Sequence, residues 1–210
     1  MVQLGYQETE RLLRKYKIHT PLSRLVSSKK ELFEALEKIK FPIAMKVYSD
    51  RILHKTDVKG IILGVDTKEE AVKAFDQLMR IKDAEAVHMQ RMHEGHHVLI
   101  GMKRDSQFGP VIAFGLGGIF VNVMKDVSFR IAPITQHDAN EMMREIKAYP
   151  ILSGFRGGKK ADFQLLRNIL MAVSKLSMDN NEIDELDLNP VIVNEKEAVA
   201  VDARFIMQEI

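Results

Sequence analysis

The chain has 210 residues, 46% of them hydrophobic and 29% charged, so it is long and apolar enough to bury a substantial core. The formal net charge is only +2 with charges well mixed, which does not suggest a nucleic-acid partner. There is no cysteine and no apolar run of membrane-spanning length, which excludes thiolate chemistry and gives no reason to expect a membrane partner. Because no continuous signal-peptide core is present, we expect a cytoplasmic protein.

The N-terminal segment, residues 1–19, mixes charged with apolar residues and predicts a short helix that docks on the body of the protein or on a partner. Residues 20–28 favour a turn and a short strand. Ser28 and Glu31 have the spacing of a capping box, and the apolar residues that follow share one helical face. The pattern therefore predicts a short amphipathic helix over 28–40.

An apolar run after Pro42 predicts a buried strand that carries Lys46 near its end. A lysine inside such a strand is costly to bury without a partner. Two interpretations stay open: an edge strand with a snorkelling side chain, or a lysine aimed at a phosphate. The polar segment 49–60 follows and contains His54, which could be a nucleophile, a general base, a ligand or a solvated loop residue.

A helix and two strands are predicted next. Thr67 and Glu70 form a second capping box, and residues 86–92 predict a strand that a glycine turn separates from another. Histidines crowd this region, but their spacing suits no zinc pattern well, and the neighbours His96 and His97 would point to opposite faces of a strand. We therefore do not expect a structural metal here.

Residues 109–133 begin as a strand, break at three glycines within four residues (Gly115, Gly117 and Gly118), and resume as extended chain. Glycine serves a tight turn, and it also lets backbone N–H groups come close to a phosphate. The residue types alone leave a turn between two strands and a phosphate cradle as alternatives.

A short helix is predicted over 135–149, followed by the glycine-rich, cationic segment 151–162 around Arg156. That segment resembles a phosphate-binding P-loop only superficially, because Lys160 stands where a P-loop has Ser or Thr. Residues 161–178 predict a strong amphipathic helix whose apolar stripe belongs to the core.

The C-terminal third holds the acidic residues. Strand alternation puts Glu185, Asp187 and Asn189 on one face, and a third strand over 198–204 carries Asp202 near its end. Carboxylate and amide oxygens on adjacent strands suit Mg²⁺ bound together with nucleotide phosphates. The alternative is a solvated polar face, which is normal for an antiparallel sheet.

Together these features resemble the ATP-grasp fold and, more narrowly, the beta subunits of ADP-forming acetyl-CoA synthetases (acetate–CoA ligases), relatives of succinyl-CoA synthetase. The blocks that carry the resemblance are ILHKTDVKGIILGV, FGPVIAFGLGGIFVNVMKDVSFRIAPI, ELDLNPVIV and VAVDAR, in the order and spacing of that family. The resemblance runs from about residue 20 to the C-terminus. It implies an α+β fold with residues 1–19 as an N-terminal helix, 20–86 as one lobe and 87–210 as the other, and a nucleotide cleft between the lobes.

The resemblance also implies a binding site for ATP or ADP. Lys46 would reach the nucleotide phosphates as a point charge. Gln90, Arg91 and Met92 would form the hinge whose backbone holds the edge of the adenine.

Two further groups of residues are implied to act on the phosphates. Gly117 and Gly118 would let the backbone approach them. Asn189 and Asp202 would hold Mg²⁺, with Asp187 beside them.

Arg130 would stabilise the transferring phosphoryl group, and His54 corresponds to a histidine of the family that is phosphorylated in transit. In this family the acyl-CoA chemistry lies on a separate alpha subunit or domain that binds CoA and carries its own phosphohistidine. The phosphoryl group would pass from there to His54 and then to ADP. Because the chain has no CoA-binding glycine fingerprint, we expect it to need that alpha partner. The α2β2 form of the assembly is implied by the family resemblance alone.

The chain departs from the family in two places. The family usually has a glutamate where this chain has His96 or His97, and the pair Gln90–Arg91 departs from the commoner glutamine–glutamate hinge. These departures put nucleotide affinity or metal geometry in question.

Two alternative functions are kept open. A stand-alone ATP-grasp carboxylate ligase would need its own acceptor site, for which no residues are evident. A non-catalytic nucleotide-binding subunit is disfavoured by the presence of His54 together with Lys46, Asn189 and Asp202.

Overall fold

The computed structural model describes residues 2–49, 51–52, 57–117 and 126–208. The chain divides into two compact units, a smaller one of residues 21–93 and a larger one of residues 1–20 and 94–210. In the described ranges, no helix combines the length and apolar character needed to cross a membrane.

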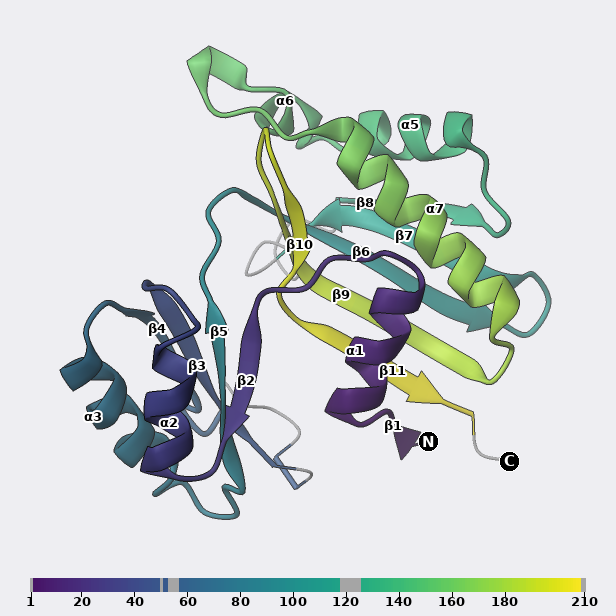
Figure 1. Cartoon of the computed structure of the whole chain (residues 1–210). Coiled ribbons are helices and arrows are strands. Elements are labelled where there is room, and N and C mark those ends of the chain that lie inside the picture. Colours follow the sequence, from purple (N-terminus) through teal and green to yellow (C-terminus); the bar gives the residue numbers. More distant parts are fainter. Residues whose placement is uncertain (1, 50, 53–56, 118–125, 209–210) are drawn as a thin grey trace. The chain divides into compact units, whose positions relative to one another are not determined.

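The smaller unit is a four-stranded antiparallel sheet with two helices (Figure 1). Its elements are β2 (Ser23–Val26), α2 (Lys29–Leu36), β3 (Ile43–Tyr48), β4 (Ile61–Val65), α3 (Lys68–Leu78) and β5 (Ala86–Arg91). The strand order β2-β5-β3-β4 places β5 and β3 in the interior of the sheet. Both helices cover one face, where Leu32 and Leu78 are fully buried against Met45 and Met89.

Side-chain caps start both helices of this unit, as the sequence predicts. The hydroxyl of Ser28 accepts a hydrogen bond from the N–H of Glu31 at 3.3 Å, and Thr67 accepts one from Glu70 at 3.1 Å. Each glutamate in turn accepts from the backbone N–H one residue before the cap. These bonds satisfy donors that a helix N-terminus would otherwise leave without partners.

The larger unit is built on a seven-stranded antiparallel sheet (Figure 1). Its strands are β1 (Val2–Gln3), β6 (His96–Asp105), β7 (Gly109–Leu116), β8 (Val127–Ile131), β9 (Ile183–Val193), β10 (Ala198–Ala200) and β11 (Ala203–Met207), and its helices are α1 (Tyr6–Lys15), α5 (Gln136–Glu145), α6 (Tyr149–Leu152), the 3-10 turn η2 (Phe155–Gly157) and α7 (Phe163–Asp179). The strand order is β1-β11-β9-β6-β7-β8, with β10 paired to β9.

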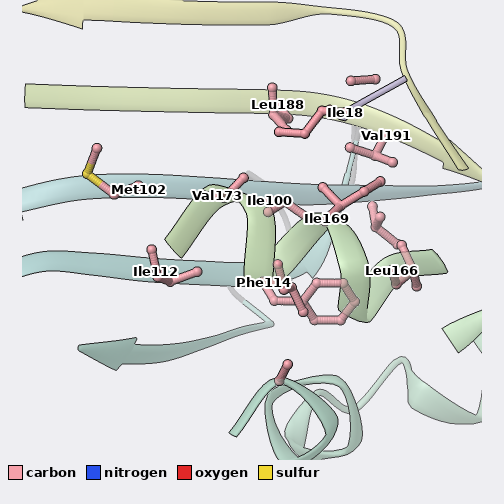
Figure 2. Close-up of a cluster of buried hydrophobic side chains, with 14 of the residues drawn as sticks. Ile18, Ile100, Met102, Ile112, Phe114, Leu166, Ile169, Val173, Leu188 and Val191 are labelled. Atoms are coloured by element: carbon pink, nitrogen blue, oxygen red, sulfur yellow. The ribbon is translucent and has the colours of Figure 1, made fainter. Parts of the chain in front are cut away.

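The core of the larger unit lies between this sheet and α7 (Figure 2). Leu166 and Val173 on the apolar stripe of α7 are fully buried and meet strand residues such as Ile100 and Phe114. The predicted amphipathic helix over 161–178 is thereby confirmed. The N-terminal segment adds Leu13 and Ile18 to the same core.

The units divide the chain differently from the predicted lobes. The predicted boundary at residue 86 falls at the start of β5, which pairs with β2 on one side and β3 on the other and so belongs to the smaller unit. The N-terminal segment belongs to the larger unit, because β1 pairs with β11 and α1 contributes to the larger core. Two strand predictions change in detail. Strand β7 runs through Gly115 to Leu116, and the strand predicted over 198–204 is two strands, β10 and β11, with Asp202 between them.

Strand register gives the larger sheet two unlike faces. Met102 lies opposite Ile112 and Leu186 in the neighbouring strands, and all three side chains are buried against the helices. The next row pairs Gly101 with Asp187 on one side. Since successive residues of a strand point to opposite faces, Asp187 lies on the face that α7 does not cover. We call this the acidic face, defined by Glu185, Asp187, Asn189, Asp202 and Arg204.

Candidate functional site

The acidic face brings together the oxygen donors that the sequence predicts as metal ligands. Asp187 and Asn189 are two residues apart on β9 and so share a face. Asp202 lies directly beside Asn189, whose backbone N–H donates to the Asp202 carbonyl oxygen at 3.2 Å. Residues from two separate parts of the C-terminal region therefore meet at one place on the sheet.

The surroundings of Asp187 on this face disfavour the ionised form of its carboxyl group. Burial first, and then the neighbouring negative charges of Glu185 and Asp202, together raise the pKa of Asp187 to about 6. Arg204 acts against this shift. It lies directly opposite Asp187 in the register of β9 and β11. Because the negative charges on this face repel one another, binding of a cation there would be favourable.

The donor set fits Mg²⁺. Carboxylate and amide oxygens are hard ligands, and Mg²⁺ is held in nucleotide sites by one or two carboxylates together with phosphate oxygens and water. Within the residues that the structure describes, no three His, Cys, Asp or Glu side chains are grouped so that they could hold a metal by themselves. The acidic face thus offers part of a coordination sphere, to be completed by other oxygens.

Arg130 lies on the other side of the sheet from these residues. On β8 it pairs with Ile112, in the row whose other members are buried under the helices. Its guanidinium donates to both carboxylate oxygens of Glu145 on α5, and this pairing raises the pKa of Arg130 and lowers that of Glu145. The structure therefore does not bring Arg130 together with Asp187 and Asn189, and it gives the residue a role in holding α5 to the sheet.

Gly117 lies at the end of β7, where it serves close strand packing. Its N–H donates to the carbonyl oxygen of His97 at 2.9 Å, and a Cβ at this position would stand 2.7 Å from the Val98 carbonyl group. The absent side chain is thus required by the neighbouring backbone. Gly118 lies outside the described residues.

Lys46 lies on the face of the smaller sheet that α2 and α3 do not cover. It is directly opposite Ile61 on β4 and His88 on β5, and it is 7% exposed. Because β3 has a strand on each side, the edge-strand interpretation is wrong. A charged amine at this depth requires compensating acceptor or anionic groups on the same face, and the phosphate interpretation stays a prediction.

The predicted hinge forms the end of β5. Gln90 is 3% exposed and lies on the same face as Lys46, opposite Ala44. The N–H of Arg91 donates to the Leu22 carbonyl oxygen, and the N–H of Met92 donates to the Pro42 carbonyl oxygen, both at 3.0 Å. These two donors are used within the unit, so recognition of a base by this segment depends on its other groups.

The histidines singled out by the sequence fall in different parts of the structure. His54, the predicted phosphoryl carrier, lies outside the described residues. His96, at a position where the resembled family usually has a glutamate, contacts the Lys159 carbonyl oxygen through Nε2 at 2.7 Å, while its neighbour His97 is half-buried with a pKa lowered by burial. His96 therefore ties the start of β6 to the cationic loop before α7.

Sequence reasoning missed Arg204. The residue stands two positions after Asp202 in the VAVDAR block, and this alternate spacing is the signal that could have placed both side chains on one face. Its relation to Asp187 depends on the register between β9 and β11, which the spacing does not reveal.

A two-unit α+β architecture with an acidic sheet face defines the class of protein, and comparison with known families agrees. A model of the ATP-grasp domain family matches residues 2–207. The chain belongs to this ATP-grasp family.

Among curated proteins, the chain is similar to the beta subunit of acetate–CoA ligase (ADP-forming) I from Pyrococcus furiosus, with 43% identity over 208 residues, covering 95% of this chain and 90% of the relative. It is also 46% identical over 187 residues to acetate–CoA ligase (ADP-forming) I from Archaeoglobus fulgidus, covering 85% of this chain but only 27% of that relative. The matched region is thus nearly a whole subunit in one relative and about a quarter of a longer chain in the other.

Among solved structures, the chain is similar to acetyl-coenzyme A synthetase 1 from Candidatus Korarchaeum cryptofilum. One structure of that protein, in complex with coenzyme A and Mg-AMPPCP and with its phosphohistidine segment pointing towards the nucleotide-binding site, matches with a TM-score of 0.88 and 36% identity over 98% of this chain and 93% of the other. Another, with coenzyme A and Ca-AMPCP, has a TM-score of 0.91.

Proposed function

We propose that this chain is the nucleotide-binding, phosphoryl-transferring beta subunit of an ADP-forming acyl-CoA synthetase. The enzyme interconverts acid, ATP and CoA with acyl-CoA, ADP and phosphate. The observation that carries the proposal is the meeting of Asp187, Asn189 and Asp202 on one sheet face, in a chain that matches an acetate–CoA ligase beta subunit over 90% of its length.

The chemical step assigned to this chain is reversible transfer of a phosphoryl group between ATP and His54. In the direction of ATP use, a lone pair on an imidazole nitrogen forms a bond to the γ-phosphorus. The bond from that phosphorus to the β,γ-bridging oxygen breaks, and its electron pair leaves with ADP. The other imidazole nitrogen releases its proton to water, and the reverse sequence makes ATP. Neutral imidazole is a suitable nucleophile for this reaction near pH 7.

Several described residues would serve this step. In the smaller unit, Lys46 offers a buried positive charge for phosphate oxygens, and Gln90 to Met92 bind the base through groups other than the two engaged N–H groups. In the larger unit, Asp187, Asn189 and Asp202 would hold Mg²⁺. Bound there with the nucleotide, the ion would neutralise charge on the phosphate oxygens.

The partner is proposed to be a CoA-binding alpha subunit, in an α2β2 assembly. This part of the proposal is supported by the beta-subunit names of two relatives and by the single-chain relative of which the matched region is 27%. The remainder of such a longer chain would correspond to a separate subunit here. The partner would carry the acyl-CoA chemistry and a second phosphohistidine.

The proposal is tested by incubating the chain and its alpha partner with Mg²⁺ and ATP labelled at the γ-phosphate. We expect acid-labile, base-stable label on this chain, and His54→Ala should remove at least about 90% of it because no nucleophile remains to accept the group. His137→Ala is the matched control and should keep the label, since His137 lies on the first turn of α5. Absence of label on the wild-type chain, with the partner present, would contradict the proposal.

A further inference from the structure

Strand β8 forms an outer edge of the larger sheet, and its exposed side chains are apolar (Figure 1). It pairs with β7 on one side, and among the described residues no strand pairs with it on the other. Phe129 and Ile131 are 58% and 52% exposed, and strand alternation puts both on the face that the helices do not cover. An exposed apolar edge of this kind is a template for pairing with another chain.

The backbone groups at this edge belong to the same apolar residues. The N–H of Ala132 donates to the Pro110 carbonyl oxygen at 2.8 Å, in the register that β7 and β8 share. Since bonded and non-bonded pairs alternate in an antiparallel ladder, Ser128 and Arg130 also bond to β7. The residues between them turn their N–H and C=O groups outward: Val127, Phe129 and Ile131. The Phe129 carbonyl oxygen accepts from Arg130 Nη1 at 2.8 Å and keeps a second lone pair for another donor.

The edge is held rigidly and lacks the usual protection against pairing. The Ser128 hydroxyl donates to the Met142 carbonyl oxygen of α5 at 2.8 Å, and Arg130 is bonded to Glu145 of the same helix. The register between β7 and β8 has no bulge, and the strand contains neither lysine nor proline. Sheets that must stay separate normally carry one of these devices on a long edge strand.

The sequence of β8 is complementary to a second copy of itself. Antiparallel pairing about Phe129 places this residue opposite its own copy and gives two further kinds of pair: Val127 with Ile131, and Ser128 with Arg130. Aromatic and branched apolar pairs of this kind stabilise a sheet, and no like charges stand directly opposite each other. The charge of Arg130 is balanced by Glu145 within its own chain, so the pairing would bury no net charge.

The other edge of the same sheet fits β8 less well. It is formed by β1, which has only two residues, Val2 and Gln3, against the five of β8. Pairing of β8 with its own copy uses the same surface on both chains and therefore closes in a dimer. Pairing of β8 with β1 of a neighbour would instead repeat without closing.

We propose that this chain forms a twofold dimer in which β8 pairs antiparallel with β8 of a second copy, so that the two larger sheets become one. The candidate metal ligands Asp187, Asn189 and Asp202 take no part, so the inference does not rest on the proposed function. It adds the surface that would join two copies of this chain in the proposed α2β2 assembly.

The first test is sedimentation equilibrium of the full chain between about 1 and 100 µM. We expect a monomer–dimer equilibrium with the dimer predominant at about 100 µM, because one strand pair is a small interface. Phe129→Lys should raise the dimer Kd at least about tenfold, since it removes the central aromatic pair and sets like charges opposite each other. Phe155→Lys is the matched control. Phe155 is 62% exposed in η2 of the same unit, away from the strands, and its variant should keep the Kd within about twofold.

The second test uses the absence of cysteine from the chain. In Phe129→Cys the two thiols would face each other across the twofold axis, with a Cα separation of about 5.5 Å that a disulfide can span. Mild oxidation should therefore link this variant into dimers much more completely than Phe155→Cys. A wild-type chain that stays monomeric at 100 µM, an unchanged Kd in Phe129→Lys, or equal cross-linking of the two cysteine variants would each overturn the inference. None of these results would affect the proposed function, which the labelling of the wild-type chain tests separately. Melting temperatures of the variants show whether the fold is kept.

Discussion

Asp187 is the residue whose environment most affects the chemistry of this chain. It is held on the acidic face by the core packing of its neighbours Leu186 and Leu188, which are buried on the other side of β9. The resulting pKa of about 6 lies well above the ordinary value of 3.8. The fold therefore retains a proton on this carboxyl group over a pH range in which the unfolded chain has lost it, and ionised Asp187 is a cost to folding in the absence of a cation.

A stability prediction follows from the sign of that shift. Below about pH 4 the carboxyl group is protonated in both states, and above pH 6 it is ionised in both, so the destabilisation is complete only above pH 6. Asp187→Asn should raise the metal-free unfolding free energy at pH 7.5 by up to about 3 kcal/mol, at roughly 1.4 kcal/mol per pKa unit. Calorimetry in chelator at pH 7.5 and pH 4 checks this, with Asp184→Asn on the same strand as control. A gain in stability that is equal at both pH values would contradict the account.

At the scale of elements, α7 depends on a side chain from the sheet at its C-terminus. Arg104 of β6 donates to the carbonyl oxygens of Ser177, Asn180 and Ile183 at 2.8, 3.2 and 3.1 Å. The last carbonyls of a helix have no partners within the helix, and a guanidinium beside them also complements the helix dipole. Arg104 thus joins the end of α7 and the start of β9 to the middle of the sheet.

Arg104→Met should lower the unfolding free energy by about 2 kcal/mol, because it keeps the apolar stem and leaves partly buried carbonyl groups without donors. For a chain of this size that corresponds to a fall in melting temperature of roughly 4–8 °C. Arg144→Met removes an exposed arginine paired within α5 and should change stability by less than about 0.5 kcal/mol. Equal melting temperatures for the two variants would show that the Arg104 cap on α7 does not contribute to stability.

The elements themselves were largely predictable from sequence, because their signals are local. The caps at Ser28 and Thr67, the stripe of α7 and the alternation that turns Asp187 and Asn189 away from the core each depend on neighbours within a few residues. The face of the sheet on which Arg130 lies was not predictable from sequence. It depends on which strand β8 pairs with and in what register, and a shift of one residue would reverse it.

At the scale of the whole molecule, the chain has two hydrophobic cores, one in each unit. The sequence predicted two lobes but placed their boundary too early, because the pairing of β5 with β2 and β3 joins residues up to 67 positions apart. It listed residues 1–19 as a division of their own that docks on the body or on a partner, whereas β1 pairs with β11 near the other end of the chain and Leu13 of α1 packs into the core of the larger unit. Contacts this distant in sequence leave no local pattern.

The central claim is that this chain carries a phosphoryl group between a partner and a nucleotide. The most direct measurement is ATP formation from acetyl-CoA, ADP and phosphate by this chain mixed with its CoA-binding alpha partner. The account predicts ATP only when both proteins are present, and loss of at least about 99% of the rate with His54→Ala, because the covalent carrier is gone. ATP formation by the chain alone, or at the wild-type rate with His54→Ala, would contradict it.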